Sequence, residues 1–219
     1  MTRTLSLLET RVLGVLMEKE HTVPDTYPLT LNALVSGCNQ KTSRDPIVNA
    51  SESEVQATID SLKSMSLVIE SSGGRVPRYS HNFERVLQVP RQAAALLATL
   101  MLRGSQTAGE LRINSDRLHP FVDISSVEAF LHELSERPAG ALVAELPRQA
   151  GSRENRWTHL LSGAPEVREP IAAAAPSAPG DLGVSELAAL KANVARLEAD
   201  VRALKTLVAK ISVDLGIQE

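Results

Sequence analysis

The sequence predicts a mainly helical α+β fold: two tandem winged helix-turn-helix domains followed by a C-terminal coiled-coil helix. Three amphipathic helical segments followed by two short extended segments occur twice in succession. Beyond them, apolar residues recur at spacings of three and four, which is the heptad pattern of a coiled coil. The predicted boundaries are 1–86 for the first domain, 87–162 for the second, 163–183 for an Ala/Pro-rich linker and 184–215 for the coiled-coil helix.

The first domain contains three predicted helices and a hairpin. Ser6-x-x-Glu9 and Ser51-x-x-Glu54 are capping boxes, in which the two side chains satisfy free backbone N–H groups at a helix start. Apolar residues at helical spacing follow both, and a shorter amphipathic stripe follows Thr30. The predicted elements are helices from 6 to about 20, 30 to 38 and 51 to about 65, then strands at 67–69 and 75–79.

The second domain repeats this order. A helix is predicted from about Pro90 to Gly104, because glycine suits the end of a helix. Thr107 opens a short second helix and Ser125 opens a third, since each is followed three residues later by glutamate. Segments 141–146 and 155–161, on either side of a turn around Gly151, predict the second hairpin.

The composition fits a globular protein, with 43% hydrophobic and 22% charged residues. Its 23 basic and 26 acidic residues give a net charge of −3, so no overall attraction draws the chain to DNA, RNA or an anionic membrane. Aromatic residues make up only 3%, too few for platforms that stack the bases of single strands. Any binding to nucleic acid therefore has to come from local basic patches.

Cysteine use and hydropathy indicate a cytoplasmic protein. Cys38 is the only cysteine, which excludes an intrachain disulfide and a thiolate zinc cluster. The N-terminus lacks the continuous apolar core of a signal peptide. No apolar run approaches the ~18 residues that a membrane-spanning helix needs. We therefore expect no membrane partner.

The C-terminal segment predicts a homodimer. β-branched residues predominate at the a positions and leucine at d, which favours a parallel two-stranded coiled coil. The alternative is a single helix that folds back on its own chain. The predicted dimer contacts are Leu187, Leu190, Val194, Leu197, Val201, Leu204, Val208, Ile211 and Leu215.

A specific motif carries a family resemblance. Residues 39–46 read Asn-Gln-Lys-x-x-Arg-Asp-Pro within the longer stretch 27–46, and Ser-Glu-Val-Gln follows at 53–56. With the leading helix pattern at 9–19, these residues resemble the YceH-like family of bacterial proteins, and the likeness covers residues 3–162. The resemblance implies a tandem winged helix with a helical C-terminal extension. It supplies no catalytic or ligand residues.

Duplex DNA binding by a non-enzymatic dimeric regulator is the first predicted function. In winged helices the third helix commonly enters the major groove, while the wing touches backbone or minor groove. Arginine and lysine bind phosphate, and asparagine or glutamine can address adenine edges. The predicted backbone contacts are Lys41, Arg44, Arg75, Arg78, Arg148, Arg153 and Arg156, and the predicted base contacts are Asn39 and Gln40.

Two alternatives remain open at the level of sequence. The wing arginines can simply solubilise exposed hairpins, and Arg44 with Asp45 can serve internal hydrogen bonds of a rigid loop. The third helices also carry carboxylates, which repel phosphate at the surface that would face DNA. The second predicted function is therefore a protein-interaction scaffold that uses the tandem winged helices and the coiled coil without binding DNA.

The sequence offers no candidate catalytic residue, metal site or cofactor site, and we expect no enzyme activity. The five histidines lack the spacing of metal ligands, and Gly73-Gly74 fits a hairpin turn better than a phosphate loop. Cys38 lies on the apolar stripe of the second helix, which favours a buried thiol over a redox sensor. Tyr79 and Trp157 are expected to anchor the wings to their cores.

Overall fold

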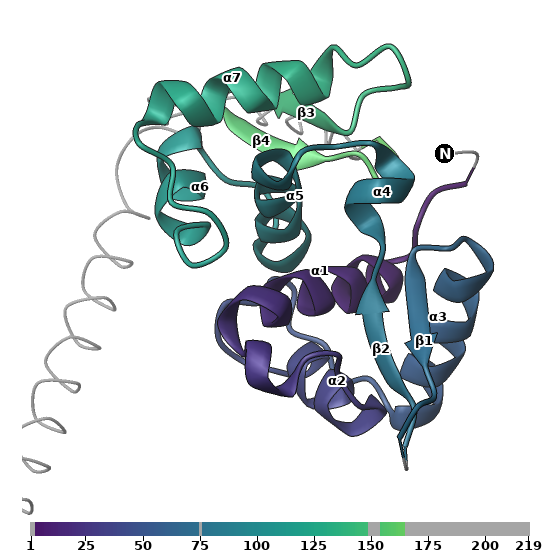
Figure 1. Cartoon of the computed structure of the whole chain (residues 1–219). Helices are drawn as coiled ribbons and strands as arrows, with labels where there is room; N and C mark the ends of the chain where they lie inside the picture. Colours follow the sequence, from purple (N-terminus) through teal and green to yellow (C-terminus); the bar gives the residue numbers. More distant parts are fainter. Residues whose placement is uncertain (1–2, 75, 149–153, 165–219) are drawn as a thin grey trace, which may run out of the picture. The chain divides into compact units, whose positions relative to one another are not determined.

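A computed structural model describes residues 3–74, 76–148 and 154–164. Within these ranges the fold is mixed α/β, with helices and two antiparallel hairpins (Figure 1). No helix in these ranges is long and apolar enough to cross a membrane. The predicted linker and coiled-coil helix, with all the predicted dimer contacts, lie outside the described residues.

The first repeat has the predicted element order. Both predicted capping boxes are present: the Ser6 hydroxyl accepts from the Glu9 N–H, and the Ser51 hydroxyl accepts from the Glu54 N–H. A single 3₁₀ turn, η1, precedes the second helix. The elements are α1 (Leu7–Thr22), η1 (Pro24–Thr26), α2 (Leu31–Cys38), α3 (Glu52–Ser64), β1 (Val68–Ser71) and β2 (Arg78–His81).

The second repeat follows through a short connecting helix that the sequence pattern did not predict. Thr107 opens its second helix with a capping box, as predicted. The third helix begins earlier than predicted, because the Asp123 carboxylate accepts the Ser126 N–H and so caps the helix before Ser125. The elements are α4 (Phe83–Leu87), α5 (Arg91–Arg103), α6 (Ala108–Asn114), α7 (Ile124–Ser135), β3 (Val143–Leu146) and β4 (Arg156–His159).

Each hairpin gains a third extended segment from the chain just before the second helix of its repeat. In the first repeat, Leu29 and Tyr79 exchange two backbone hydrogen bonds, of 3.0 and 2.8 Å. In the second, Gln106 and Trp157 do the same at 3.0 and 2.7 Å. The Tyr79 and Trp157 rings are buried, which confirms that they anchor the hairpins to the core.

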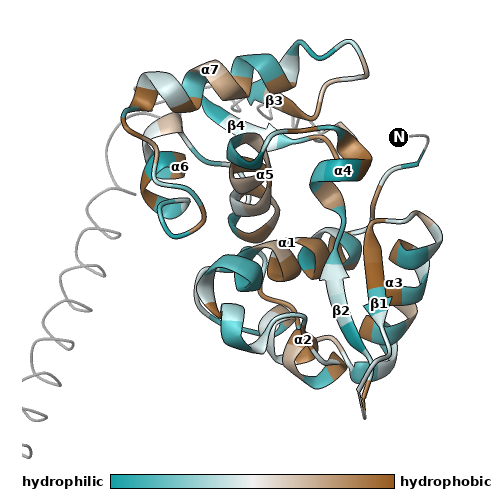
Figure 2. Ribbon diagram, viewed as in Figure 1, coloured by the Kyte–Doolittle hydropathy of each residue, from teal (hydrophilic) through white to brown (hydrophobic). Residues whose placement is uncertain are grey.

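The core runs through both repeats because α1 packs directly against α5 (Figure 2). Along α1 every residue from Glu9 to Met17 is buried, so the helix is covered on all sides in its centre. The repeats therefore share one compact unit, Met1–Glu166. At its edge the Leu5 N–H donates to the Leu161 carbonyl at 2.7 Å, which ties the start of the first repeat to the end of the second.

Gly14 permits the close approach of α1 to α5. A Cβ atom at this position would lie 2.9 Å from the Leu102 side chain. Gly14→Ala is therefore expected to lower the free energy of unfolding by about 1–2 kcal/mol, since overpacking outweighs the better helix propensity of alanine. Urea denaturation followed by circular dichroism measures this change.

Gly109 in α6 provides the matched control. There an added Cβ would meet its nearest atom at 3.8 Å, an ordinary contact. Gly109→Ala should thus leave stability unchanged or raise it by up to about 1 kcal/mol. Equal effects of the two substitutions would show that α1 and α5 do not approach closely at Gly14.

Candidate functional site

The loop between α2 and α3 uses its two predicted base-contact residues to hold its own shape. The Asn39 side chain donates to the Ala50 carbonyl and accepts the Ala50 N–H, both at 2.8 Å. The Gln40 amide donates to the Thr42 carbonyl at 3.0 Å and to its hydroxyl at 3.2 Å. Both amides are thus occupied inside the loop, while Lys41 is exposed beside them.

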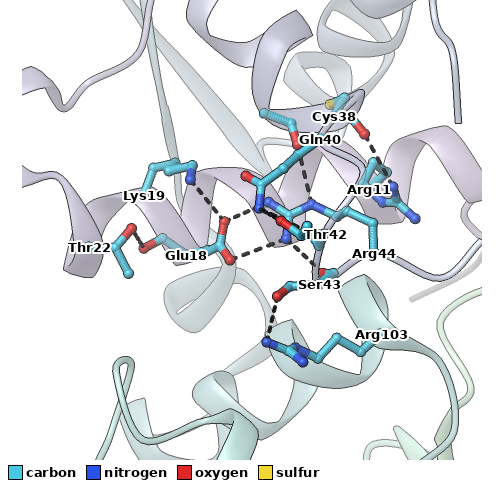
Figure 3. Close-up of polar contacts among 11 residues, drawn as sticks. Arg11, Glu18, Lys19, Thr22, Cys38, Gln40, Thr42, Ser43, Arg44 and Arg103 are labelled. Atoms are coloured by element: carbon cyan, nitrogen blue, oxygen red, sulfur yellow. Dashed lines mark hydrogen bonds and ion pairs between the residues drawn. The ribbon is translucent and has the colours of Figure 1, made fainter. Parts of the chain in front are cut away.

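Arg44, predicted to contact DNA, points into the protein instead. Its side chain is 0% exposed and forms a two-pronged ion pair with Glu18 of α1, at 2.6 and 3.2 Å (Figure 3). Its Nε also donates to the Gly37 carbonyl at 3.2 Å. A guanidinium with these buried partners is not offered to a phosphate outside, so the structure supports the alternative of an internal role.

Arg11 is a buried cation that the sequence interpretation missed. Its guanidinium donates to the Cys38 carbonyl at 3.2 Å and to the Pro46 carbonyl at 2.5 Å, which fastens both ends of the loop to α1. Burial and the nearby charge of Arg44 lower the pKa of Arg11. The sequence feature that could have indicated this role is the position of Arg11 among the apolar residues of α1. Burial raises the pKa of Cys38 to about 12, in agreement with a structural thiol.

The family motif at 39–46 also joins the two repeats. The Arg103 guanidinium, at the end of α5, donates to the Ser43 hydroxyl at 2.8 Å (Figure 3). Two residues on, the Asp45 N–H donates to the Leu102 carbonyl at 2.8 Å. The motif thus binds α1 on one side through Arg44 and α5 on the other.

We call the contact of the motif 39–46 with α1 and α5 the joint between the repeats. A polar cleft of about 220 Å³ lies beside this joint, with walls from both repeats. Its carboxylate is Glu18, which Arg44 already pairs and which has Lys19 Nζ at 3.3 Å. Burial alone would raise the pKa of Glu18, but hydrogen bonds and charge from Arg44 and Lys19 outweigh burial and lower it. The polar lining includes Lys19, Gln40, Ser43, Arg103, Asn114 and Arg117.

Two predicted hairpin contacts, Arg78 and Arg156, occupy corresponding positions in the two repeats. Each begins the second strand of its hairpin and binds the segment before the second helix. Arg78 donates to the carbonyls of Thr26 and Pro28, at 3.1 and 2.7 Å. Arg156 donates to the Ser105 carbonyl at 2.7 Å and forms an ion pair with Glu110 at 2.8 Å. Both therefore fasten their hairpins to the core.

The remaining predicted contacts divide between exposed residues and residues outside the description. Arg148, just after β3, is exposed. Arg75 and Arg153 lie outside the described residues. Of the predicted set, Lys41 and Arg148 are thus the cations that the structure presents to solvent without a hydrogen bond or ion pair to a described residue.

The outward faces of the third helices are acidic. Glu52 and Asp60 are exposed on α3. On α7 the acids Glu128 and Glu133 are exposed, and so is Glu136 at its C-cap. The carboxylates that the sequence places on the third helices are therefore exposed on the surface of the fold.

An apolar patch lies at the corner between α6 and α7. Ile113, Val122 and Ile124 are 72%, 87% and 45% exposed. Arg112, next to Ile113, donates to the Val122 carbonyl at 3.1 Å, and Ile124 Cδ1 lies near Gly109 of α6. Ile124 thus lies beside the first turn of α6, and Ile113 follows Gly109 one helical turn later on the same helix. We call these three residues the corner patch.

Metal-ligand geometry is absent from the described part of the chain, where no three His, Cys, Asp or Glu side chains could hold an ion together. His159 on β4 is half-buried, and burial lowers its pKa to about 4. Its imidazole is thus neutral at physiological pH.

The chain is similar to several bacterial proteins over most of its length. Residues 5–152 match a family model described as a protein of unknown function, DUF480. A UPF0502 protein of Dechloromonas aromatica is 58% identical over 94% of this chain and 95% of its own length. One of Burkholderia ambifaria is 57% identical over 98% and 91%. Another, from Methylibium petroleiphilum, is 61% identical over 91% and 84%.

Proposed function

We propose that this chain, which belongs to the DUF480 family of proteins of unknown function, is a tandem winged-helix adaptor that binds another protein and catalyses no reaction. The membership agrees with the resemblance to YceH-like proteins. It assigns no activity, so the proposal rests on the surface of the described residues.

The winged-helix assignment is supported by the order of the elements and by the extra pairing. Three helices precede a hairpin in each repeat. The Leu29–Tyr79 and Gln106–Trp157 bridges add an extended segment between the first and second helices. A helix, an extended segment, two helices and a hairpin are the parts of a winged helix-turn-helix domain.

The corner patch is the observation that carries the adaptor proposal. Exposed apolar residues that adjoin one another mark interaction sites, whereas isolated ones are ordinary. Val122 lies next to Asp123, the N-cap of α7, and the exposed Glu128 follows one turn into the helix. An apolar centre with a polar rim is the usual composition of a protein–protein interface.

The negative charges on α7 disfavour DNA binding at this helix. In a winged helix, α7 would be the element that enters the major groove. Glu128 and Glu133 on its exposed face would meet the phosphates at close range, and their repulsion would reduce affinity. The acids on the outer face of α3 act in the same sense in the first repeat.

Duplex DNA binding remains the second candidate function, because the exposed Lys41 and Arg148 lie on the loop and hairpin that border the third helices. Each offers a weak phosphate contact. A homodimer joined through residues 184–215 would combine two such surfaces and raise the effective concentration of the second. This dimer is itself a proposal.

A salt titration of duplex DNA binding separates the two candidates. With the full-length chain and a fluorescent duplex, the adaptor proposal expects no saturable binding at ~50 mM salt. Saturable affinity that falls steeply with salt, and that decreases in the Lys41→Ala/Arg148→Ala variant, would support the second candidate and contradict the first.

The corner patch has its own test in living cells. A photo-crosslinking residue placed at Val122 is expected to give one discrete protein adduct, because this side chain would be buried in the interface. Ile113→Glu should reduce that adduct about tenfold, since a carboxylate in an apolar contact costs more than 1 kcal/mol. Crosslinked bands are quantified by immunoblotting.

The control crosslinker replaces Val76, which is 51% exposed at the tip of the first hairpin, away from α6 and α7. It should give no such adduct. Identical adduct patterns from both positions, or a Val122 adduct that Ile113→Glu leaves unchanged, would mean that the corner patch is not an interaction surface.

A further inference from the structure

We propose that the polar cleft between the two repeats binds a small phosphate-bearing anion. Three cationic side chains line the cleft: Lys19 from α1, Arg103 from the end of α5 and Arg117 from the segment after α6. They come together only in the folded chain, because they belong to both repeats. This site is independent of the corner patch and of the adaptor proposal.

The charge of the cleft is not balanced by its own carboxylate. Glu18 borders the cleft, but its two oxygens face the two terminal nitrogens of Arg44 at 3.2 and 2.6 Å. Arg44 therefore compensates Glu18 from behind, with a side chain that is fully buried. Lys19 shares this carboxylate at 3.3 Å, and neither Arg103 nor Arg117 forms an ion pair with a described carboxylate.

Arg103 and Arg117 have guanidinium N–H groups that form no hydrogen bond with the described residues. Arg103 uses one nitrogen to hold Ser43, and no described carboxylate forms an ion pair with it. Burial lowers the pKa of Arg103 and so does the charge of Arg44, while Glu18 opposes them. The Arg117 side chain makes no hydrogen bond or ion pair with the residues that the structure describes, and it is exposed at the cleft. An anion would pair with both guanidinium groups.

The size and lining of the cleft point to a compact oxyanion. Its volume of about 220 Å³ is below the ~300–1,000 Å³ of sites for drug-sized ligands. No aromatic side chain lines it, so a nucleotide base would find no stacking partner. A planar guanidinium group can donate two parallel hydrogen bonds to two oxygens of a phosphate. Free phosphate and the phosphate group of a small ester share this chemistry.

Amide and hydroxyl groups around the cations can complete the coordination of such an anion. The Asn114 amide also lines the cleft, and its Nδ2 donates to Gln106 at 2.7 Å, which holds the side chain in a fixed orientation. Ser43, in the loop between α2 and α3, accepts a hydrogen bond from the Arg103 guanidinium. Because these groups come from both repeats, a bound anion would add contacts across the joint that the family motif forms.

The experiment is isothermal titration calorimetry of the full-length chain with inorganic phosphate and, separately, with glycerol 3-phosphate, each against sodium chloride of equal ionic strength. We expect saturable binding with a Kd of about 1 mM or lower for at least one of them. Binding of phosphate itself indicates a site for the free ion, whereas binding of the ester alone indicates that the organic part is also recognised.

Variants connect the signal to the cleft. Arg117→Gln should weaken binding by about tenfold and leave the fold intact, since this side chain holds no described neighbour. Arg103→Gln should weaken it at least as much. Arg85→Gln, which removes an exposed cation on α4, should bind like the parent chain. Equal affinity of the parent and Arg117→Gln, or no saturable binding of either compound up to 10 mM, would overturn the proposal.

Discussion

Replacing Arg44 with methionine is expected to lower the free energy of unfolding by about 3 kcal/mol, because the largely buried Glu18 would lose its two-pronged partner and keep only Lys19. The Gly37 carbonyl would lose a donor as well. The long apolar side chain of methionine keeps most of the packing volume, so the loss reports on charge rather than on a cavity. Urea denaturation at neutral pH measures it.

Two further variants test this explanation. Arg148→Met removes an exposed arginine with no described partner and should change stability by less than about 0.5 kcal/mol. The double variant Arg44→Met/Glu18→Gln should recover part of the loss, since it removes the largely buried negative charge that Arg44 had compensated. If Arg44→Met were as mild as Arg148→Met, the ion pair would not fix the loop.

The second large effect is expected on cutting the chain at the boundary between the repeats. A fragment of residues 1–86 should lack a cooperative unfolding transition, whereas residues 1–164 should show one. The fragment would expose the side of α1 that packs on α5, including the surroundings of Gly14. Domains of this size bury little surface and are marginal even when intact. Differential scanning calorimetry and far-ultraviolet circular dichroism distinguish the two outcomes.

The complementary fragment offers a control for this argument. Residues 87–164 lose the same contact from the other side, since α5 is buried from Ala93 to Leu102 in the intact unit. We expect this fragment to be unstable as well, and a mixture of both fragments to regain helical signal. A fragment 1–86 that unfolds cooperatively by itself would mean that the shared core is not required.

Local signals in the sequence predict the elements well. The capping boxes at Ser6, Ser51 and Thr107 involve residues three apart, so the hydrogen bonds that open these helices can be anticipated from spacing alone. The start of α7 cannot be anticipated in this way. Asp123 and Ser125 both suit a helix cap, and only the backbone around them decides between the two.

The site was harder to predict because its contacts depend on distant parts of the chain. Arg44 and Glu18 are far apart in sequence and meet only when the loop closes on α1. The pattern of an exposed, polar loop therefore suggested a DNA contact, although the physical alternative of an internal hydrogen-bond role was visible. Arg11 was missed for a related reason, since the carbonyls that justify a buried guanidinium belong to Cys38 and Pro46.

The acidic character of the third helices could be predicted from the sequence, whereas the contacts of individual cations could not. Carboxylates on the third helices were evident from the sequence, and the structure shows them exposed. The corner patch was not predicted, because Val122 and Ile124 look like ordinary core positions until the turn before α7 directs them outward. Exposure of apolar residues is a tertiary property that hydropathy does not reveal.

The hydrogen bond from Leu5 to Leu161 joins the first and last segments of the compact unit. Gly163 lies close to Thr4 at the same place, so the two ends of the described fold are next to each other. A mechanical load applied between these ends would be borne first by this seam, before it reached the contact of α1 with α5. The same closure makes the unit suited to circular permutation, with the old ends fused and new ones opened at the first hairpin turn.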